Sequence, residues 1–352
     1  MSIHNMLRLN RKDCASYYSF PKTSYPVNTA QIGVGYWGPN LLRNLISNKD
    51  CWIKSIFDPS HQRQQYVKSI YPSIEIAQTL EDVMTDPEID AVVIATPAKT
   101  HFELVVSALE NGKHVLVEKP MATSVSEAEK IAALADKTGL IVMVGHTFIY
   151  NSAVRYLKML IDSGELGEIR YIYSQRVNLG RIRSDVDALW NFAPHDVSII
   201  QYLLKDPSPI SVMRKGMDYI QKGIEDVVFM NIHYPDKIMA HIHVSWLDPS
   251  RIRKMTIVGS RKMVIYDDIA INKIAIYDKG IDRMAVLGEH MDYDHSDFFN
   301  FNHRSGDVIL PKIDSKEPLK EEISHFLDCI KNSTPCLTGP EHAKKVIQIL
   351  SQ

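Results

Sequence analysis

Residues 30–40 read Ala30-Gln31-Ile32-Gly33-Val34-Gly35-Tyr36-Trp37-Gly38-Pro39-Asn40, a short apolar strand that runs through three glycines into a helix. In the pattern Gly33-x-Gly35-x-x-Gly38, the first glycine permits a tight turn and the second lets the backbone approach a pyrophosphate. The third lets the helix pack close to the strand, and the helix N-terminus then faces the phosphates. We expect a dinucleotide-binding turn here, with Tyr36 and Trp37 beside the cofactor.

The next apolar run, residues 52–57, ends in Asp58, about one strand–helix–strand unit downstream. A carboxylate at this place accepts hydrogen bonds from both hydroxyls of a ribose. No arginine follows Asp58 directly, so the sequence favours NAD over NADP.

Length and composition predict two domains and a small-molecule substrate. The 352 residues are 45% hydrophobic, which exceeds what one ordinary core holds. A net charge of −2 provides no strong positive field, so nucleic acid and anionic membranes are not expected partners.

Four widely spaced cysteines form no C-x-x-C pair, which favours reduced thiols and no cysteine metal site.

No run of about 18 apolar residues is present, and residues 1–28 lack the apolar core of a signal peptide. We therefore expect a cytoplasmic protein. The basic opening resembles a transit peptide faintly, and we interpret residues 1–28 as a leader that is disordered or wrongly assigned to the protein.

Residues 29–147 alternate apolar strands with amphipathic helices, as in a Rossmann domain with a doubly wound parallel sheet. Residues 148–352 instead predict an α+β domain built on an open, mostly antiparallel sheet with one buried face. The overall class is α/β. The strands expected in the second domain are 171–177, 227–234, 238–246, 253–259 and 262–267, and the helices are 154–163, 195–204 and 320–331.

Three further motifs complete a resemblance to a known family. They are Ala95-Thr96-Pro97 with His101, Glu118-Lys119-Pro120, and Trp190-Asn191-Phe192-Ala193-Pro194-His195-Asp196. Together with the glycine turn, they resemble the Gfo/Idh/MocA oxidoreductases over residues 29–350. The resemblance implies a nicotinamide cofactor and a reaction at a ring carbon of a sugar, inositol or nucleotide sugar. It also implies cofactor contacts from Thr96, Pro97, His101, Glu118 and Lys119.

Within that family, residues 36–40, 180–185 and 245–249 look most like bacterial nucleotide-sugar 3-dehydrogenases. That likeness implies UDP-N-acetylhexosamines or their uronates as substrates, in surface-polysaccharide pathways. Free-sugar or inositol oxidation is the alternative within enzymes, and a non-catalytic NAD-binding sensor is the alternative outside them.

Lys119 is the expected base, because oxidation of a secondary alcohol requires a group that accepts the hydroxyl proton. It follows the carboxyl end of a parallel strand, where ligands bind in open α/β sheets. Partial burial beside a cationic nicotinamide would lower its pKa toward neutrality. A cis peptide before Pro120 would help to aim its side chain.

His195 and Asn191 complete the expected catalytic group. We place His195 at the start of a helix entered at Pro194, where the helix N-terminus disfavours imidazolium, and we expect Asp196 to stabilise the first turn. Many relatives have Asp four residues before this histidine, but this chain has Asn191, which cannot carry a proton. Asn191 can still hydrogen-bond a substrate and orient His195. Two possibilities remain open: a subgroup of active enzymes that uses Asn at this position, or a protein that binds the cofactor and turns over slowly.

The sequence also offers residues with weaker evidence for a place in the substrate site. His146, Tyr150 and Asn151 follow the last Rossmann strand and are expected to line the sugar pocket, as matching positions do in relatives. Arg181 and Arg183 lie on a polar loop that could meet a diphosphate.

Residues 292–303 hold three aspartates and two histidines, but no known ligand spacing, so no metal is expected. A homodimer or homotetramer through the open sheet face is expected.

Overall fold

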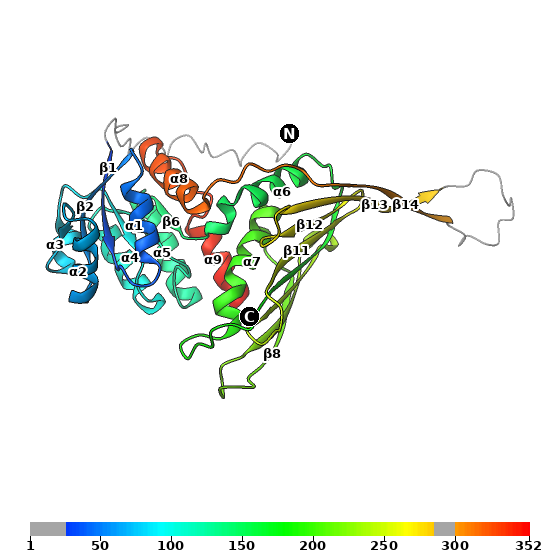
Figure 1. Ribbon diagram of the computed structural model, residues 1–352, viewed down its shortest axis with the longest axis horizontal. Coiled ribbons are helices and arrows are strands. Elements are labelled where there is room, and N and C mark those ends of the chain that lie inside the picture. Colours follow the sequence, from blue (N-terminus) through cyan, green and yellow to red (C-terminus); the bar gives the residue numbers. More distant parts are fainter. Residues whose placement is uncertain (1–25, 285–299) are drawn as a thin grey trace, which may run out of the picture. The chain divides into compact units, whose positions relative to one another are not determined.

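The computed structural model describes residues 26–284 and 300–352, which form two compact units (Figure 1). The first unit contains residues up to Val117, Lys130–Met143 and Ile323–Gly339. The second contains Glu118–Glu129, Val144–Glu322 and Pro340–Gln352. Most of the proposed leader, and four of the five polar residues considered for a metal near residue 300, lie outside the described residues.

A six-stranded sheet with the order β3-β2-β1-β4-β5-β6 forms the Rossmann fold, as predicted. Its central strands β1 (Val27–Ile32) and β4 (Ala91–Ile94) are parallel neighbours. All four residues of β4 are buried, as expected for a strand covered on both faces. The other strands are β2 (Cys51–Phe57), β3 (Glu75–Ile76), β5 (His114–Val117) and β6 (Val142–Val144).

The order reverses beside β1, which has β2 on one side and β4 on the other. Ligands bind at such a switch point in open α/β sheets, outside the carboxyl ends of the strands. The helices between the strands are α1 (Gly38–Ile46), α2 (His61–Ile70), α3 (Leu80–Thr85), α4 (His101–Glu110) and α5 (Val125–Thr138).

The second sheet has eight strands in the order β14-β13-β12-β11-β7-β10-β9-β8. Among the described residues, neighbouring strands of this sheet are antiparallel except β7 and β10, which are parallel. This confirms the expected mostly antiparallel sheet. The strands are β7 (Ile169–Val177), β8 (Ser211–Met217), β9 (Val227–His233), β10 (Met239–Ser245), β11 (Ile252–Gly259), β12 (Met263–Asp267), β13 (Ile274–Met284) and β14 (Asn300–Ile309).

Helices α6 (Ser152–Asp162), α7 (Ala188–Leu204) and α9 (Pro340–Leu350) lie on one face of this sheet (Figure 1). Their apolar residues and the inward residues of the strands share one core. In β9, Val228, Met230 and Ile232 are buried while the residues between them are more exposed, so the sheet keeps an open second face. The remaining long helix is α8 (Pro318–Asn332).

The expected start of the helix that carries His195 was wrong. Helix α7 begins at Ala188, where the Asp187 side chain accepts a hydrogen bond from the Trp190 N–H, and Pro194 lies inside the helix. Proline usually ends or begins a helix, which is why the sequence suggested an entry there. His195 is therefore two turns into α7 and does not sit at its N-terminus.

No helix in residues 26–284 and 300–352 combines the length and the apolar character needed to cross a bilayer.

Candidate functional site

The glycine turn after β1 has the geometry that the sequence predicted. Gly33 has φ +91°, and a Cβ there would lie 2.6 Å from the Ala95 carbonyl oxygen. A Cβ on Gly38 would lie 2.6 Å from the Gly33 carbonyl oxygen, so both glycines are required by close packing. A Cβ on Gly35 would meet nothing within 4 Å. The protein itself therefore does not require glycine at 35, whereas an approaching pyrophosphate would.

Asp58 lies against this turn after β2. Its carboxylate accepts hydrogen bonds from the Val34 N–H at 2.8 Å and the Ser60 N–H at 2.9 Å. These contacts fix the carboxylate at the carboxyl edge of the first sheet, where it can meet a ribose. Tyr36, at the tip of the turn, is 92% exposed.

The loop after β4 is held by His101. His101 is buried, and its Nε2 lies 2.9 Å from the Thr96 carbonyl oxygen. Thr96 also exchanges a hydrogen bond with the Thr100 hydroxyl at 2.7 Å. His101 thus shapes the Thr96–Pro97 loop from inside, and direct cofactor contact by these residues stays a prediction.

Lys119 lies just after β5, with a cis peptide bond to Pro120. Its Nζ donates to the main-chain oxygen of Asn191 at 3.3 Å, which joins the two segments within the second unit. Burial lowers the pKa of Lys119 to about 8, against the opposing effect of Glu118, and the charges of Arg176 and Arg183 lower it further. A sizeable fraction of this amine is neutral near physiological pH, as a proton acceptor requires.

His195 lies close to this amine on α7. Burial lowers its pKa well below the ordinary value, and the charges of Lys119 and Arg176 act in the same direction. The imidazole is therefore neutral, as expected. The cause is burial and nearby positive charge, and not the position at a helix N-terminus that the sequence suggested. Its Nδ1 is buried without a hydrogen-bond partner among the described residues, and its ring packs on Phe148 with 4.9 Å between centroids.

A buried ion pair anchors α7 beside these groups. Arg176 on β7 donates to the Asp196 carboxylate at 2.7 Å, and the Ser174 hydroxyl donates to the same carboxylate at 2.7 Å. The Arg176 guanidinium also covers the Phe148 ring at 4.6 Å. Asp196 therefore fixes the helix to the sheet and does not cap a first turn, which corrects the expectation for this residue.

The sequence of residues 27–146 matches the oxidoreductase family with an NAD-binding Rossmann fold, Gfo/Idh/MocA, and residues 154–265 match the family's C-terminal domain. An uncharacterized oxidoreductase of Escherichia coli, YdgJ, is 33% identical over 67% of this chain and 69% of its own length. The chain belongs to the Gfo/Idh/MocA family.

Two further comparisons show how varied the similar proteins are. A scyllo-inositol 2-dehydrogenase (NAD(+)) of Bacillus subtilis is 30% identical over 51% of this chain and 54% of its own length. The solved UDP-N-acetylglucosamine 3-dehydrogenase GnnA of Acidithiobacillus ferrooxidans is 22% identical, with a TM-score of 0.74 over 92% of this chain and 95% of that one. This second likeness shows the fold. The chain spans only 60% and 59% of the length of two other relatives that it matches.

Two more buried histidines of this Gfo/Idh/MocA protein lie against each other, and one of them is near Lys119. His146 is buried, and burial together with the charges of His342 and Lys119 lowers its pKa well below the ordinary value. Its ring meets that of His342 edge-on, with 5.5 Å between centroids. His342 in turn lies 2.7 Å from the Asp206 carboxylate. His146 could be predicted from the sequence, but His342 could not, because it lies on α9, far away in the chain.

The other expected substrate residues have structural contacts of their own. Tyr150 is buried, with the Arg155 guanidinium 5.3 Å from its ring centre. The Asn151 side chain accepts from the Ala153 N–H and caps α6. Arg183 forms an ion pair with Asp185 at 2.5 Å, and Arg181 is on the same exposed loop. Their contact with substrate stays a prediction.

Sequence reasoning also missed Phe148, Arg176 and Glu322. Phe148 lies two residues after His146 in the sequence, which was the one available signal. Glu322 is fully buried, and burial together with the charge of Glu118 raises its pKa well above the ordinary value. Nothing in its sequence neighbourhood distinguishes it from other helix glutamates.

Proposed function

We propose that this protein is an NAD-dependent oxidoreductase that moves a hydride between NAD and a ring secondary alcohol of a nucleotide sugar. The observation that carries the proposal is the pairing of Lys119, whose pKa is lowered to about 8, with the neutral imidazole of His195. Both groups belong to one compact unit, where the amine can accept a proton near neutral pH and the neutral imidazole can hydrogen-bond the reacting oxygen.

The residues of the Rossmann unit fit NAD. Gly35 leaves open space where a pyrophosphate would approach, α1 presents its N-terminal N–H groups, and the Asp58 carboxylate is fixed beside them. A carboxylate at this place accepts from ribose hydroxyls and repels a 2′-phosphate, which favours NAD over NADP. When bound, NAD supplies the carbon that accepts the hydride.

In the oxidation direction, the amine of Lys119 takes the hydroxyl proton as the C–H bond yields its hydride. The amine is held by the Asn191 carbonyl, and it becomes an ammonium while the alcohol becomes a ketone. His195 contributes a neutral imidazole that hydrogen-bonds the reacting oxygen or passes its proton to or from Lys119. Asn191, on the same side of α7 as His195, offers an amide donor in place of a carboxylate.

The charges around Lys119 favour an anionic substrate. Arg176, Arg183 and Arg253 are each close enough to influence the pKa of Lys119 or His195. Each forms an ion pair with an aspartate, but the arginine charges still lower the pKa of Lys119 or His195, so their effect at these two side chains is positive. A UDP-N-acetylhexosamine or its uronate, oxidised at C3, carries negative charge, and the fold of a UDP-N-acetylglucosamine 3-dehydrogenase is shared.

The test is NADH absorbance during incubation of the enzyme and NAD with a panel of UDP-sugars, free sugars and inositols. We expect turnover with a UDP-sugar, and a loss of about 10² to 10⁴ in kcat for Lys119→Met with NADH affinity retained. Tight NADH binding without turnover of any panel member would contradict the enzyme proposal and favour a sensor.

An inositol or free-sugar dehydrogenase is the second candidate, supported by the B. subtilis relative and by the pairing of Arg183 with Asp185. The Arg181→Ala/Arg183→Ala double variant separates the two. A UDP-sugar enzyme whose loop touches the diphosphate will show a raised KM, whereas an inositol or free-sugar enzyme will keep its KM.

A further inference from the structure

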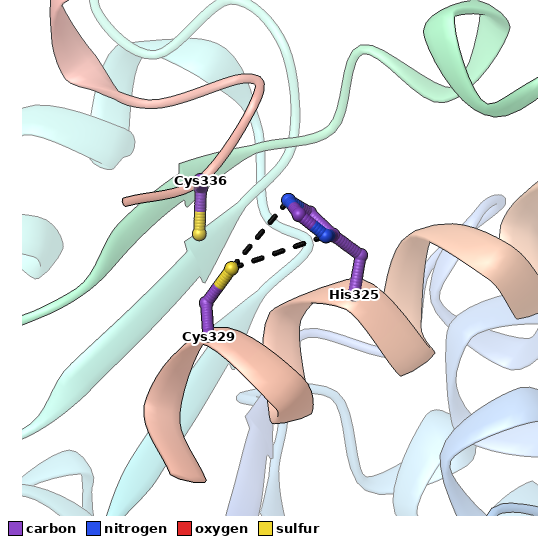
Figure 2. A group of neighbouring side chains, drawn as sticks. All are labelled: His325, Cys329 and Cys336. Atoms are coloured by element: carbon purple, nitrogen blue, oxygen red, sulfur yellow. Dashed lines mark hydrogen bonds between the residues drawn. The ribbon is translucent and has the colours of Figure 1, made fainter. Parts of the chain in front are cut away.

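Two thiols and an imidazole come together near the end of α8, among residues that the proposed function does not use. His325 and Cys329 lie on α8, and Cys336 lies on the segment before α9. One nitrogen or sulfur atom from each residue lies within 4.8 Å of the others. Figure 2 shows the Cys329 sulfur facing the Cys336 sulfur, with dashed lines from the Cys329 sulfur to both imidazole nitrogens of His325.

The local chain geometry produces this cluster. A four-residue step places His325 and Cys329 on one face of α8. Ser333, with φ +51°, turns the chain, and the Thr334 N–H then donates to the Cys329 carbonyl oxygen at 3.0 Å. The returning segment brings Cys336 to the same face, where the Leu337 N–H donates to Nε2 of His325 at 3.1 Å.

The separations suit a tetrahedral ion. With Zn–S and Zn–N bonds of about 2.3 and 2.0 Å, a sulfur and a nitrogen on one ion are about 3.5 Å apart. Nε2 of His325 lies 3.5 Å from the Cys329 sulfur, and Nδ1 lies 3.9 Å from it. To bind an ion through Nε2, the imidazole would exchange its hydrogen bond from the Leu337 N–H for a bond to the metal.

We propose that His325, Cys329 and Cys336 bind one Zn²⁺ ion, with the fourth position open to water. Thiolate and imidazole ligands select zinc over magnesium or calcium, and two thiolates balance the ion's charge. Cys329 is buried while His325 and Cys336 are half-buried, so the site has both a protected side and an entry side. The ion would join α8 to the segment that follows it, within the first unit.

The test uses the full-length, tag-free, reduced chain after removal of metal with a chelator. Co²⁺ is titrated in while the thiolate-to-cobalt charge-transfer band and the visible bands of four-coordinate cobalt are recorded, and Zn²⁺ is then added as a competitor. We expect both bands to saturate at a single equivalent, to disappear with Zn²⁺, and Zn²⁺ to raise the melting temperature.

Matched variants make the result specific. Cys336→Ser and His325→Ala should each lose the single-equivalent endpoint and the rise in melting temperature. Cys51→Ser, a buried thiol outside the cluster, and Cys14→Ser, outside the described residues, should keep both. Circular dichroism checks that each variant is folded.

Reduced wild-type protein without the bands would overturn the proposal, as would bands that persist in the folded Cys336→Ser and His325→Ala variants. Counting free thiols without reductant detects another outcome, a disulfide between Cys329 and Cys336. If that disulfide forms and the reduced protein binds no ion, the zinc proposal is also overturned. Because none of these readouts uses turnover, failure here leaves the proposed oxidoreductase activity untouched.

Discussion

Lys119 is the proposed proton acceptor, and its ionisation predicts how the activity changes with pH. Its pKa is lowered to about 8, mainly by burial. Below that pH the amine is protonated and cannot accept the substrate proton. We expect kcat/KM for alcohol oxidation to rise with pH and to level off above about pH 8, whereas kcat/KM for ketone reduction should fall above it.

Asn191→Asp should move that profile. The Asn191 main chain touches the Lys119 amine, so a carboxylate on this residue would stabilise the ammonium and raise the pKa of Lys119. We expect the midpoint for oxidation to shift to higher pH in Asn191→Asp but not in Asn191→Ala. An unchanged midpoint in Asn191→Asp would place the side chain too far from the amine to take part.

Gly35 and Gly33 give a matched pair for the cofactor. Gly35→Ala meets no protein atom, so its unfolding free energy should change by less than about 0.5 kcal/mol while NADH binding weakens. Gly33→Ala forces a Cβ against the Ala95 carbonyl at positive φ and should lower the melting temperature. Thermal unfolding and NADH fluorescence titration measure both. Unweakened NADH binding in Gly35→Ala would argue against the proposed pyrophosphate position.

At the scale of elements, helix α7 shows what could and could not be predicted. The four-residue spacing of Asn191 and His195 correctly predicted a shared helical side. The start of the helix was wrong because Pro194 normally marks an end, and the stabilising effect of Asp187 at the true start was not recognised. The Arg176–Asp196 pair was missed because it links residues 20 positions apart through the fold.

The strands also include some that could be predicted from the sequence and some that could not. The glycine turn and Asp58 could be predicted because both depend on local sequence, and the alternating strands β7 and β9 to β12 were recognised within one or two residues. Strands β8, β13 and β14 and helix α9 were missed. In β8 only two of the seven residues are even partly buried, so its pattern of apolar residues is weak.

Breaking the ion pair that holds α7 should destabilise the second unit strongly. Asp196→Asn leaves a buried guanidinium without its counter-charge, and such changes cost about 3 to 5 kcal/mol. We expect a large fall in the melting temperature by calorimetry. The Arg176→Met/Asp196→Leu double variant removes both charges and should recover much of the loss. A small effect of Asp196→Asn would mean that the pair contributes little.

At the scale of the whole molecule, the open face of the large sheet is the predicted site of self-association. Phe229 is 44% exposed and stacks on His243 at 4.3 Å, and His241 stacks on Tyr173 at 5.3 Å on neighbouring strands. This aromatic row lies on the face away from the core, where a second copy could cover it.

Phe229→Glu tests this prediction. A charge in the middle of a covered face should convert a dimer or tetramer into a smaller species, whereas Ile271→Glu, at a fully exposed turn residue, should not. Light scattering coupled to size-exclusion chromatography reports the mass. A wild-type monomer, or an unchanged mass for Phe229→Glu, would contradict the predicted interface.

The lowered basicity of Lys119 should also allow this residue to be labelled selectively. An uncharged amine is a nucleophile, and at mildly alkaline pH most lysines of the chain still carry their proton. An acylating reagent small enough to reach the amine of the half-buried Lys119 should therefore modify this residue ahead of the exposed lysines. Mass mapping of the labelled peptide would then report how accessible the amine is, independently of any knowledge of the substrate.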